Sequence, residues 1–391
     1  MKSEQFLNRC LVFLIKPSHW LVFVLWLLMM APASASVALR VAIEQGVNQV
    51  KIGTSSPATV KDAYGRVVGE LSAMGGFAAQ LHDGKIALHQ WTSPQIWVEP
   101  KGEGYIWIGD RWYRGAVILT PHQGGVTAVN YVDLEKYLYS VLGAEMSSDW
   151  PQEALKAQAV AARTYALHER ERSEEIYDVT DDQFSQVYQG IVTESPATYA
   201  AVDGTANQVL VYNGQVILAV FHSASGGHTE NVEDIWMNPL PYLRGVPDFD
   251  QGTPGYEWSE TFSRADLTQR IPGVGNIISL TPERTTPHGS IVTLKVIGET
   301  GTKVMRGEEI QRMLGLRSIR FNITPNYSPI ARTTGSSALP SSFEIKGLGF
   351  GHAVGMSQWG AYNLAKQGYN YQQILNYYYQ GASLAIAQVT P

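Results

Sequence analysis

One glutamate, Glu145, has the sequence surroundings of a proton donor. It lies in the short connection between two predicted helices, beside Met146 and close to Trp150. A carboxyl group that is partly removed from water has a raised pKa, and it can then donate a proton near neutral pH. The competing interpretation is a solvated glutamate in an ordinary loop. The sequence therefore makes Glu145 a candidate general acid, with both interpretations open.

The predicted helix after Glu145 carries two cations, Lys156 and Arg163, seven residues apart. They lie about 10 Å apart along one helix face, and Gln152 shares that stripe. Either the stripe is a hydrated outer face, or it lines a groove for a polymer with repeating anionic groups.

A glycine-containing turn carries two histidines, His222 and His228, six residues apart. With Glu233 or Asp234 they could hold a zinc ion, although the spacing matches no standard metal motif. A hydroxyl-rich turn that packs against a strand is the other interpretation.

Two further segments have polar groups suited to an extended ligand. Residues 182–190 combine amide side chains with aromatic ones, which suits sugar hydroxyls and sugar faces. Residues 347–361 are rich in glycine, with His352 near the centre, and lack the Lys-Ser/Thr pair of a nucleotide-binding loop. Their glycines allow the backbone to approach a ligand or a neighbouring helix closely.

The composition narrows the class of protein. The chain has 391 residues, a net charge of -6, only 16 % charged residues, and 20 Tyr and 10 Trp. Disordered chains are rich in charge and poor in aromatics, so overall disorder is excluded. The negative charge and the absence of basic runs argue against nucleic-acid binding.

The N-terminal segment has the pattern of a targeting signal. Lys2, Arg9 and Lys16 precede an apolar run over residues 20–30, which small residues at A-x-A spacing follow. We expect residues 1–35 to be a secretory signal peptide cut after Ala35, with an uncleaved anchor as the alternative. The protein is then exported to the periplasm or cell wall. The single cysteine lies in this segment, so the mature chain has no thiolate nucleophile or thiolate metal ligand.

The elements predicted along the chain give an α+β protein. Short alternating runs up to about residue 119 predict an antiparallel β-rich subdomain. We expect its four tryptophans in the core of the sheet, with a platform for sugars as the alternative. Asp133 is expected to cap a helix that ends at Gly143, and Pro151 to open an alanine-rich central helix that runs to about Leu167. We predict five segments: the signal (1–35), the β-rich subdomain (36–120), the first part of the core (121–237), an inserted lobe and linker (238–342), and the C-terminal part of the core (343–391).

Other patterns predict the later elements. Asn213-Gly214 predicts a hairpin between strands at residues 208–212 and 216–221. Within the lobe we expect a strand over 291–296 and a helix over 306–314. Helices over 357–367 and 370–379 are expected to end at glycines.

Several of these segments, taken together, resemble the SpoIID/LytB family of peptidoglycan proteins. The resemblance rests on Tyr131-Val132-Asp133-Leu134-Glu135-Lys136-Tyr137-Leu138, on Gly143-Ala144-Glu145-Met146, and on the specific run from Trp150-Pro151-Gln152-Glu153 to Ala162-Arg163-Thr164-Tyr165. Ser185-Gln186-Val187-Tyr188, the turn from His222 to Gly227, and residues 347–361 follow in family order. Ser147 and Ala353 depart from the family pattern, because the family usually has Pro and Gly at these positions.

The resemblance implies a lytic transglycosylase that cleaves the MurNAc-GlcNAc bond of glycan strands without stem peptides and leaves 1,6-anhydro-MurNAc ends. Glu145 matches the catalytic acid of the family. We expect no required cofactor. Because some relatives bind zinc near the His222 turn, a zinc ion at His222 and His228 is the alternative. The candidate glycan-binding residues are Gln152, Lys156, Gln158, Arg163, Gln186, Tyr188, Ser223, Ser225, His352, Ser357 and Gln358.

A non-catalytic function is the alternative that the LytB branch implies. Such a protein binds glycan and stimulates an N-acetylmuramoyl-L-alanine amidase, which would be its partner. In either case we expect peptidoglycan strands as the ligand, no nucleic acid, and membrane contact only through an uncleaved N-terminal segment.

Overall fold

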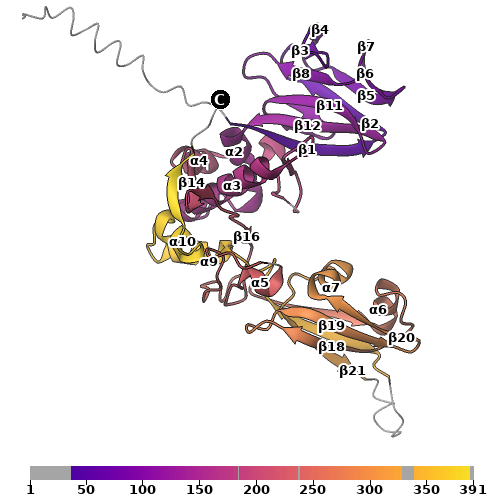
Figure 1. The fold of residues 1–391 in the computed structure, drawn as a ribbon, viewed down its shortest axis with the longest axis vertical. Coiled ribbons are helices and arrows are strands. Elements are labelled where there is room, and N and C mark those ends of the chain that lie inside the picture. The colour runs from indigo at the N-terminus through magenta and orange to yellow at the C-terminus, as the bar shows by residue number, and fades with distance from the viewer. Residues whose placement is uncertain (1–36, 184, 237, 328–338, 388–391) are drawn as a thin grey trace, which may run out of the picture. The chain divides into compact units, whose positions relative to one another are not determined.

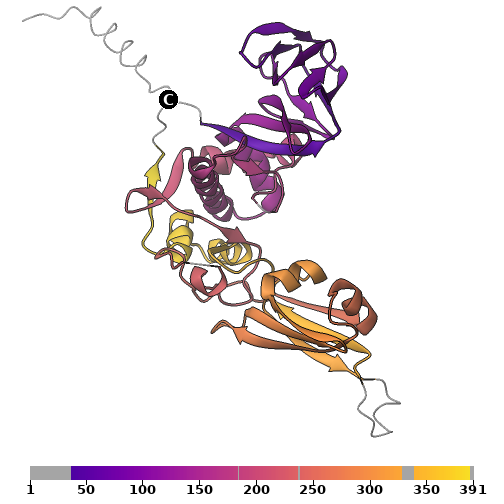
Figure 2. The ribbon, with the colours of Figure 1, turned by 45° about the vertical axis from the view of Figure 1, so that its right-hand side comes forward.

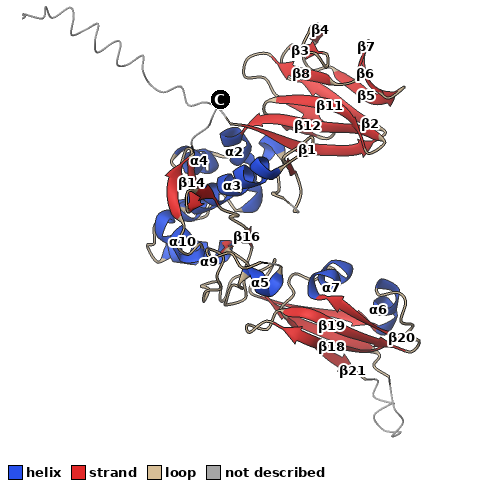
Figure 3. Cartoon of the chain, viewed as in Figure 1, coloured by secondary structure: helices blue, strands red, loops and turns tan. Residues whose placement is uncertain are grey.

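The computed structural model describes residues 37–387 apart from Phe184, Met237 and residues 328–338 (Figure 1). The predicted signal over 1–35 and most of the linker predicted over 326–342 lie outside the described residues. The described chain combines helices with several sheets, which confirms the α+β class (Figure 3). None of the helices within the described ranges is long and apolar enough to span a lipid bilayer.

A seven-stranded sheet forms one layer of the N-terminal region, in the order β13-β1-β12-β11-β8-β3-β4. All neighbouring strands are antiparallel except β13, which pairs parallel with β1. The sheet continues past the boundary predicted at residue 120, because β12 pairs with both β1 and β11. The strands are β1 (Ala38–Val47), β3 (Ala58–Lys61), β4 (Val67–Leu71), β8 (Ile96–Pro100), β11 (Ala116–His122), β12 (Gly125–Asp133) and β13 (Val179–Thr180).

A six-stranded antiparallel sheet, β10-β9-β2-β5-β6-β7, packs against the first sheet through contacts of β2, β5 and β6 with β11 and β12. Its strands are β2 (Gln49–Thr54), β5 (Gly76–His82), β6 (Lys85–Leu88), β7 (Trp91–Ser93), β9 (Ile106–Ile108) and β10 (Arg111–Tyr113).

The expectation that the four tryptophans fill this core is wrong. In β9, Ile106 and Ile108 are fully buried, and Trp107 between them lies on the opposite face of the sheet. There its ring packs against the ring of Trp112, with centroids 5.3 Å apart. All four tryptophans, the other two being Trp91 and Trp97, keep part of their surface exposed, so aliphatic side chains form the interior.

Helix α2 (Leu134–Glu145) begins where the sequence predicts, because the Asp133 side chain accepts a hydrogen bond from the backbone N–H of Lys136. It does not end at Gly143, however, and Glu145 is its last residue. Gly143 serves close packing instead, since a β-carbon there would lie 1.9 Å from the carbonyl oxygen of Thr193. Thr193 ends the 3-10 turn η1 (Gly190–Thr193).

Helix α3 (Gln152–Arg172) begins after Pro151 as predicted and extends beyond Leu167. Its alanines are almost all fully buried, because other elements surround it: α2, α4 (Pro196–Asp203), β14 (Gln208–Tyr212), α9 (Gln358–Lys366) and α10 (Tyr371–Tyr378) (Figure 2). The small side chains allow this close approach, so α3 is the central helix that the sequence predicts.

The predicted Asn213-Gly214 hairpin is confirmed, with both residues at positive φ between β14 and β15 (Gln215–Val216). The strand expected over 216–221 is broken, since only its ends belong to strands, β15 and β16 (Phe221–His222). β14 also pairs with β24 (Ser383–Ile386) near the C-terminus.

Residues 257–348 form two three-stranded sheets with their own apolar cluster, in which Ile271, Leu294 and Phe343 are buried. The predicted strand at 291–296 and helix at 306–314 are confirmed as β19 and α7. The elements are β17 (Glu257–Ser263), α6 (Arg264–Arg270), β18 (Ile277–Thr285), β19 (Ile291–Gly298), β20 (Gly301–Arg306), α7 (Gly307–Leu314), β21 (Phe321–Asn326) and β22 (Ser342–Leu348).

The C-terminal helices are confirmed as α9 and α10. The Ser357 and Asn370 side chains cap their first turns, and Gly368 follows α9 at a positive φ. β16 pairs parallel with β23 (Met356–Ser357), so the chain before the 257–348 region meets the chain after it. The short α5 (Val232–Ile235) packs in the same apolar cluster as these helices and α3.

Candidate active site around Glu145

The Glu145 carboxylate is held between two segments that are far from it in sequence. Its Oε1 accepts a hydrogen bond of 3.0 Å from the backbone N–H of Val187, and its Oε2 accepts one of 3.2 Å from Nε2 of Gln358. Burial raises the pKa of Glu145 above its ordinary value, and this outweighs the two hydrogen bonds, which lower it. The C-terminal end of α2, where the helix dipole is negative, also disfavours the ionised form. A glutamate in this environment can both give up and take back a proton.

The loop that presents Val187 is fixed by two residues predicted to bind glycan, Gln186 and Tyr188. Gln186 Oε1 accepts a hydrogen bond from the Tyr137 hydroxyl and its Nε2 donates to the Ala162 carbonyl, at 3.1 and 3.2 Å. The Tyr188 hydroxyl donates to the side-chain oxygen of Asn130 at 2.9 Å. Both residues are buried. Gln186 and Tyr188 therefore position the loop, and their assignment as glycan-binding residues is corrected.

The same loop contains a second carboxyl with a raised pKa, that of Asp181. Burial raises this pKa from 3.8 to about 6. The Asp181 carbonyl also accepts the N–H of Tyr188 at 3.1 Å. Nothing in the local sequence of Asp181 indicates that a neighbouring element covers it, so its raised pKa could not be predicted from the sequence.

Three aromatic residues, Trp150, Trp359 and Tyr362, pack together on the two chain segments that carry Glu145 and Gln358. The Trp150 ring packs against Trp359 and Tyr362, with centroids 4.5 and 5.0 Å away, and Trp359 and Tyr362 are 5.3 Å apart. Trp150 follows Glu145 in the connection to α3, and Trp359 follows Gln358 on α9. All three are partly exposed. Trp150 and Trp359 lie within the sequence motifs described above, whereas Tyr362 lies outside them. The spacing of residues 359 and 362 on a predicted helix is the signal that could have identified Tyr362.

The groove for anions predicted on α3 is not formed, because Arg163 lies in the core. Its guanidinium donates two hydrogen bonds, of 2.7 and 2.6 Å, to Glu135, and others to the carbonyls of Val202 and Gln208. The side chain is 1 % exposed. Arg163 therefore binds α2 and β14 to the central helix, and its assignment as a glycan-binding residue is corrected.

The other candidates on α3 are also held within the protein. Lys156 forms an ion pair of 2.8 Å with Glu153 and lies over the Tyr371 ring. Gln152 Nε2 donates to the Ala197 carbonyl at 3.3 Å, and Gln158 is fully buried. Of these three, only Lys156 and Gln152 keep any exposed surface.

The serines predicted to bind glycan divide into two groups. The buried Ser225 donates to Asp248 at 2.6 Å, and the buried Ser357 accepts the N–H of Gly360 as the cap of α9. Both therefore have structural roles. Ser223 is partly exposed, and its carbonyl accepts the N–H of Trp359 at 3.0 Å. Gln358 is the predicted residue that the structure brings directly to Glu145.

The histidines do not form the zinc site that the sequence allowed. His222 Nδ1 lies 3.1 Å from the Val354 carbonyl and its ring contacts His352, whereas His228 stacks on His288 at 3.6 Å. Over the described part of the chain, no three His, Cys, Asp or Glu residues converge as metal ligands. Burial lowers the pKa of both His222 and His352 to about 3, so each imidazole is neutral and neither is a proton donor at neutral pH. The residues that are present do not fit a bound zinc ion.

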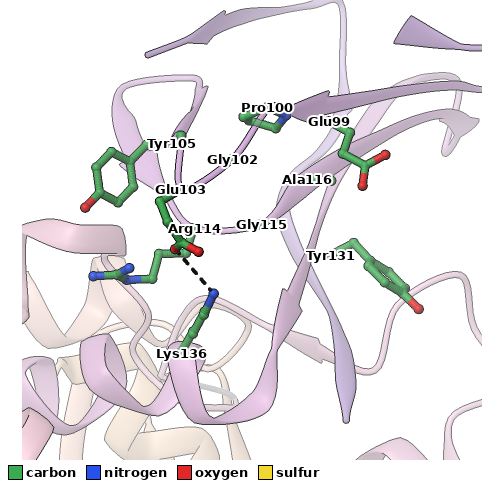
Figure 4. Close-up of a pocket in the computed structure, with 11 residues that line it drawn as sticks. Glu99, Pro100, Gly102, Glu103, Tyr105, Arg114, Gly115, Ala116, Tyr131 and Lys136 are labelled. Carbon is green, nitrogen blue, oxygen red and sulfur yellow. Dashed lines mark ion pairs between the residues drawn. The ribbon is translucent and has the colours of Figure 1, made fainter. Parts of the chain in front are cut away.

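A cavity of about 210 Å³ lies at the first turn of α2 (Figure 4). Lys136 and Glu103 form an ion pair of 3.7 Å beside it. Lys136 and Glu145 lie near opposite ends of α2, about 13 Å apart along the helix axis. The cavity is therefore separate from the Glu145 site.

Comparisons with known proteins show the family of the chain. Residues 122–212 match the family model of the stage II sporulation protein SpoIID, and residues 243–355 match a domain of unknown function, DUF8618. Stage II sporulation protein D of Bacillus subtilis is 34% identical over 281 residues, which cover 66% of this chain and 76% of that protein. An uncharacterized protein of Brachyspira hyodysenteriae is 32% identical over 274 residues, which cover 70% of this chain and 72% of that protein.

A further relative, the amidase enhancer of Bacillus subtilis, is 30% identical over 290 residues, which cover 63% of this chain and 40% of that protein. Glu145, its Val187 donor and the alanine-rich helix all fall inside the region that matches the family model. The chain belongs to the SpoIID/LytB family.

Proposed function

We propose that this protein is a peptidoglycan lytic transglycosylase that cleaves the MurNAc-GlcNAc bond of glycan strands without stem peptides. The observation that carries the proposal is the environment of Glu145: a partly buried carboxyl group with a raised pKa and two hydrogen-bond donors, on a chain segment whose Trp150 packs against Trp359. This environment suits a residue that acts first as an acid and then as a base.

One carboxyl group is enough for this reaction. Protonated Glu145 donates its proton to the glycosidic oxygen, and the bond from that oxygen to C1 of MurNAc breaks. The C6 hydroxyl of the same MurNAc attacks C1 and forms the 1,6-anhydro bond, while ionised Glu145 accepts the hydroxyl proton. Ordinary glycosidases need a second carboxylate to act as nucleophile or to activate water, whereas here the substrate supplies the nucleophile. Val187 and Gln358 stabilise the ionised carboxylate between the two proton transfers.

Glu145→Gln tests this proposal, because it keeps the shape of the side chain and removes the proton. We expect the release of anhydro products from stripped glycan to fall by about 10² to 10⁴ in kcat, the usual contribution of a general acid. Glu171→Gln, at an exposed position near the end of α3, is the matched control and is expected to leave kcat unchanged. Equal product release by the wild type and Glu145→Gln would refute the role of Glu145.

The pH profile gives a second measure of the same role. The acid step needs protonated Glu145, so activity falls as the pH rises through the pKa of that group. Gln358→Leu removes a donor that favours the ionised form. It therefore raises the pKa of Glu145 further and moves the alkaline limb of the profile to higher pH.

Similarity to a protein named amidase enhancer favours a second candidate function. In that case the protein binds glycan and increases the turnover of an N-acetylmuramoyl-L-alanine amidase. Stimulation of the amidase by wild type and Glu145→Gln alike, without any anhydro product, would favour this function.

Both functions place the protein outside the cytoplasmic membrane, in the periplasm or cell wall. The support is the basic and apolar pattern of residues 1–35, a segment that lies outside the described residues. Detection of the protein in spheroplast supernatants tests export, and the mass of the exported protein shows whether the segment is removed.

A further inference from the structure

Trp150, before α3, and Trp359 and Tyr362, on helix α9, pack together, and we call these three rings the aromatic strip. Trp359 directly follows Gln358, whose side chain donates a hydrogen bond of 3.2 Å to the Glu145 carboxylate. Neither indole N–H takes part in a hydrogen bond among the described residues, whereas the indole of Trp258 donates to Ser318. Partly exposed rings with free N–H groups offer both a stacking surface and donors to a hydroxylated ligand.

Lys366 extends the strip by one helical turn. Gln358, Tyr362 and Lys366 are four residues apart on α9 and so share one face. The Lys366 ammonium lies 5.4 Å from the centre of the Tyr362 ring. Lys366 is exposed, and among the described residues it has no carboxylate partner within ion-pair distance. A cation thus lies about 12 Å along the helix axis from the residue that holds Glu145.

The cations that the sequence suggested for anion binding are neutralised by the protein itself. Arg163 is paired with Glu135 in the core, and Lys156 is paired with Glu153 at 2.8 Å. Lys366 has no such partner among the described residues, and it borders the exposed rings. Of these three cations, it is therefore the one that remains able to bind an anionic group of a ligand.

We propose that the aromatic strip binds the apolar faces of sugar rings and that Lys366 binds the lactyl carboxylate of a muramic acid residue. This inference rests on the proposed glycan substrate and adds the residues that select it. In a strand without stem peptides the lactyl group ends in a carboxylate, whereas a stem peptide converts it into a neutral amide. A cation at this position therefore distinguishes stripped strands from peptide-bearing ones.

The test measures the affinity of the full chain carrying Glu145→Gln, so that turnover during the measurement is small. The probes are stripped glycan oligosaccharides, the same oligosaccharides with stem peptides, and N-acetylglucosamine oligomers, which have no lactyl group. Lys366→Gln is expected to weaken binding of the stripped probe by about two- to fivefold, as for a partly exposed ion pair, and to leave the other two unchanged. Lys366→Arg is expected to retain the binding, and Lys51→Gln, at an exposed lysine on β2, is the matched control.

The aromatic strip is tested with the same three probes. Trp359→Ala is expected to weaken all of them by about tenfold or more, as for a central aromatic contact. Tyr362→Leu is a milder variant in case Trp359→Ala does not fold, and circular dichroism verifies the folding of each.

Three results would overturn the inference. If Lys366→Gln binds the stripped probe as tightly as Lys51→Gln does, the ion pair is excluded. If Lys366→Gln loses affinity equally for all three probes, Lys366 does not recognise the lactyl carboxylate. Unchanged binding by both aromatic variants excludes the strip. These outcomes differ from failure of the transglycosylase proposal, in which the wild type releases no anhydro product while the binding pattern remains.

Discussion

Replacing Glu135 by glutamine tests whether Arg163 is a structural residue. Two oxygens of Glu135 accept hydrogen bonds of 2.7 and 2.6 Å from a guanidinium whose side chain is 1 % exposed. Removal of one partner of a buried ion pair typically costs about 3–5 kcal/mol, because the other charge stays buried without compensation. Glu135 itself is 23% exposed, and the carbonyls of Val202 and Gln208 still accept from Arg163. We therefore expect the lower end of that range, about 3 kcal/mol.

Urea unfolding, with linear extrapolation to water, measures this loss. Glu99→Gln removes the partner of Lys61 in an exposed pair and should cost at most about 1 kcal/mol. The double variant Arg163→Met with Glu135→Leu should recover much of the lost stability, because apolar residues replace both charges. A loss for Glu135→Gln no larger than that of Glu99→Gln would refute the reasoning, since it would mean that water reaches the guanidinium and that a glycan carboxylate could reach it too.

Two further predictions concern Asp181 and Ala353. The pKa of Asp181 is about 6 in the folded chain, above the ordinary value of 3.8. Between these two pH values the folded chain therefore binds more protons than the unfolded chain. Protonation of Asp181 thus stabilises the fold as the pH falls from 6 toward 4. Asp181→Asn should raise the unfolding free energy at pH 7 by about 1 kcal/mol and remove the gain on acidification, and chemical denaturation at pH 7 and pH 5 tests both. Ala353 has a φ of 60°, where an L-residue is strained by about 1–2 kcal/mol and glycine is not. After the backbone entropy cost of glycine is subtracted, Ala353→Gly should raise the free energy of unfolding by about 0.5–1 kcal/mol. A lower thermal midpoint for Ala353→Gly would contradict this.

Local signals predicted the helices well because their causes are local. Asp133, Ser357 and Asn370 accept backbone N–H groups three residues later in the chain, and such caps are visible in the sequence itself. The NG hairpin was predictable for the same reason, since its two residues adopt the positive φ that the turn needs.

Predictions failed where a distant element decides the environment of a side chain. The spacing of Lys156 and Arg163 on one helix was correct, but the sequence could not show that Glu135, on another helix, would draw Arg163 into the core. Trp107 was expected inside a sheet, and which face of β9 is buried depends on the register of its neighbours and on the second sheet. The position of Gly143 against Thr193 likewise depends on the fold around it.

The Glu145 site depends both on local sequence signals and on contacts between distant elements. Its Val187 and Gln358 donors are 42 and 213 residues away in the sequence. The pKa of Glu145 is raised by burial and partly lowered again by these donors, so it is a property of the assembled core and not of the loop that the sequence suggested. The chain between Glu145 and Gln358 includes the whole region of β17 to β22. The segments before and after that region are joined by the pairing of β16 with β23 and by the bridge between Ala224 and Phe350. Because these contacts bring the ends of the region together, it can form its own apolar cluster without separating Gln358 from Glu145. The acid therefore depends on the closure of the inserted region, and a variant that breaks the β16–β23 pairing should affect Glu145 even though it leaves α2 intact.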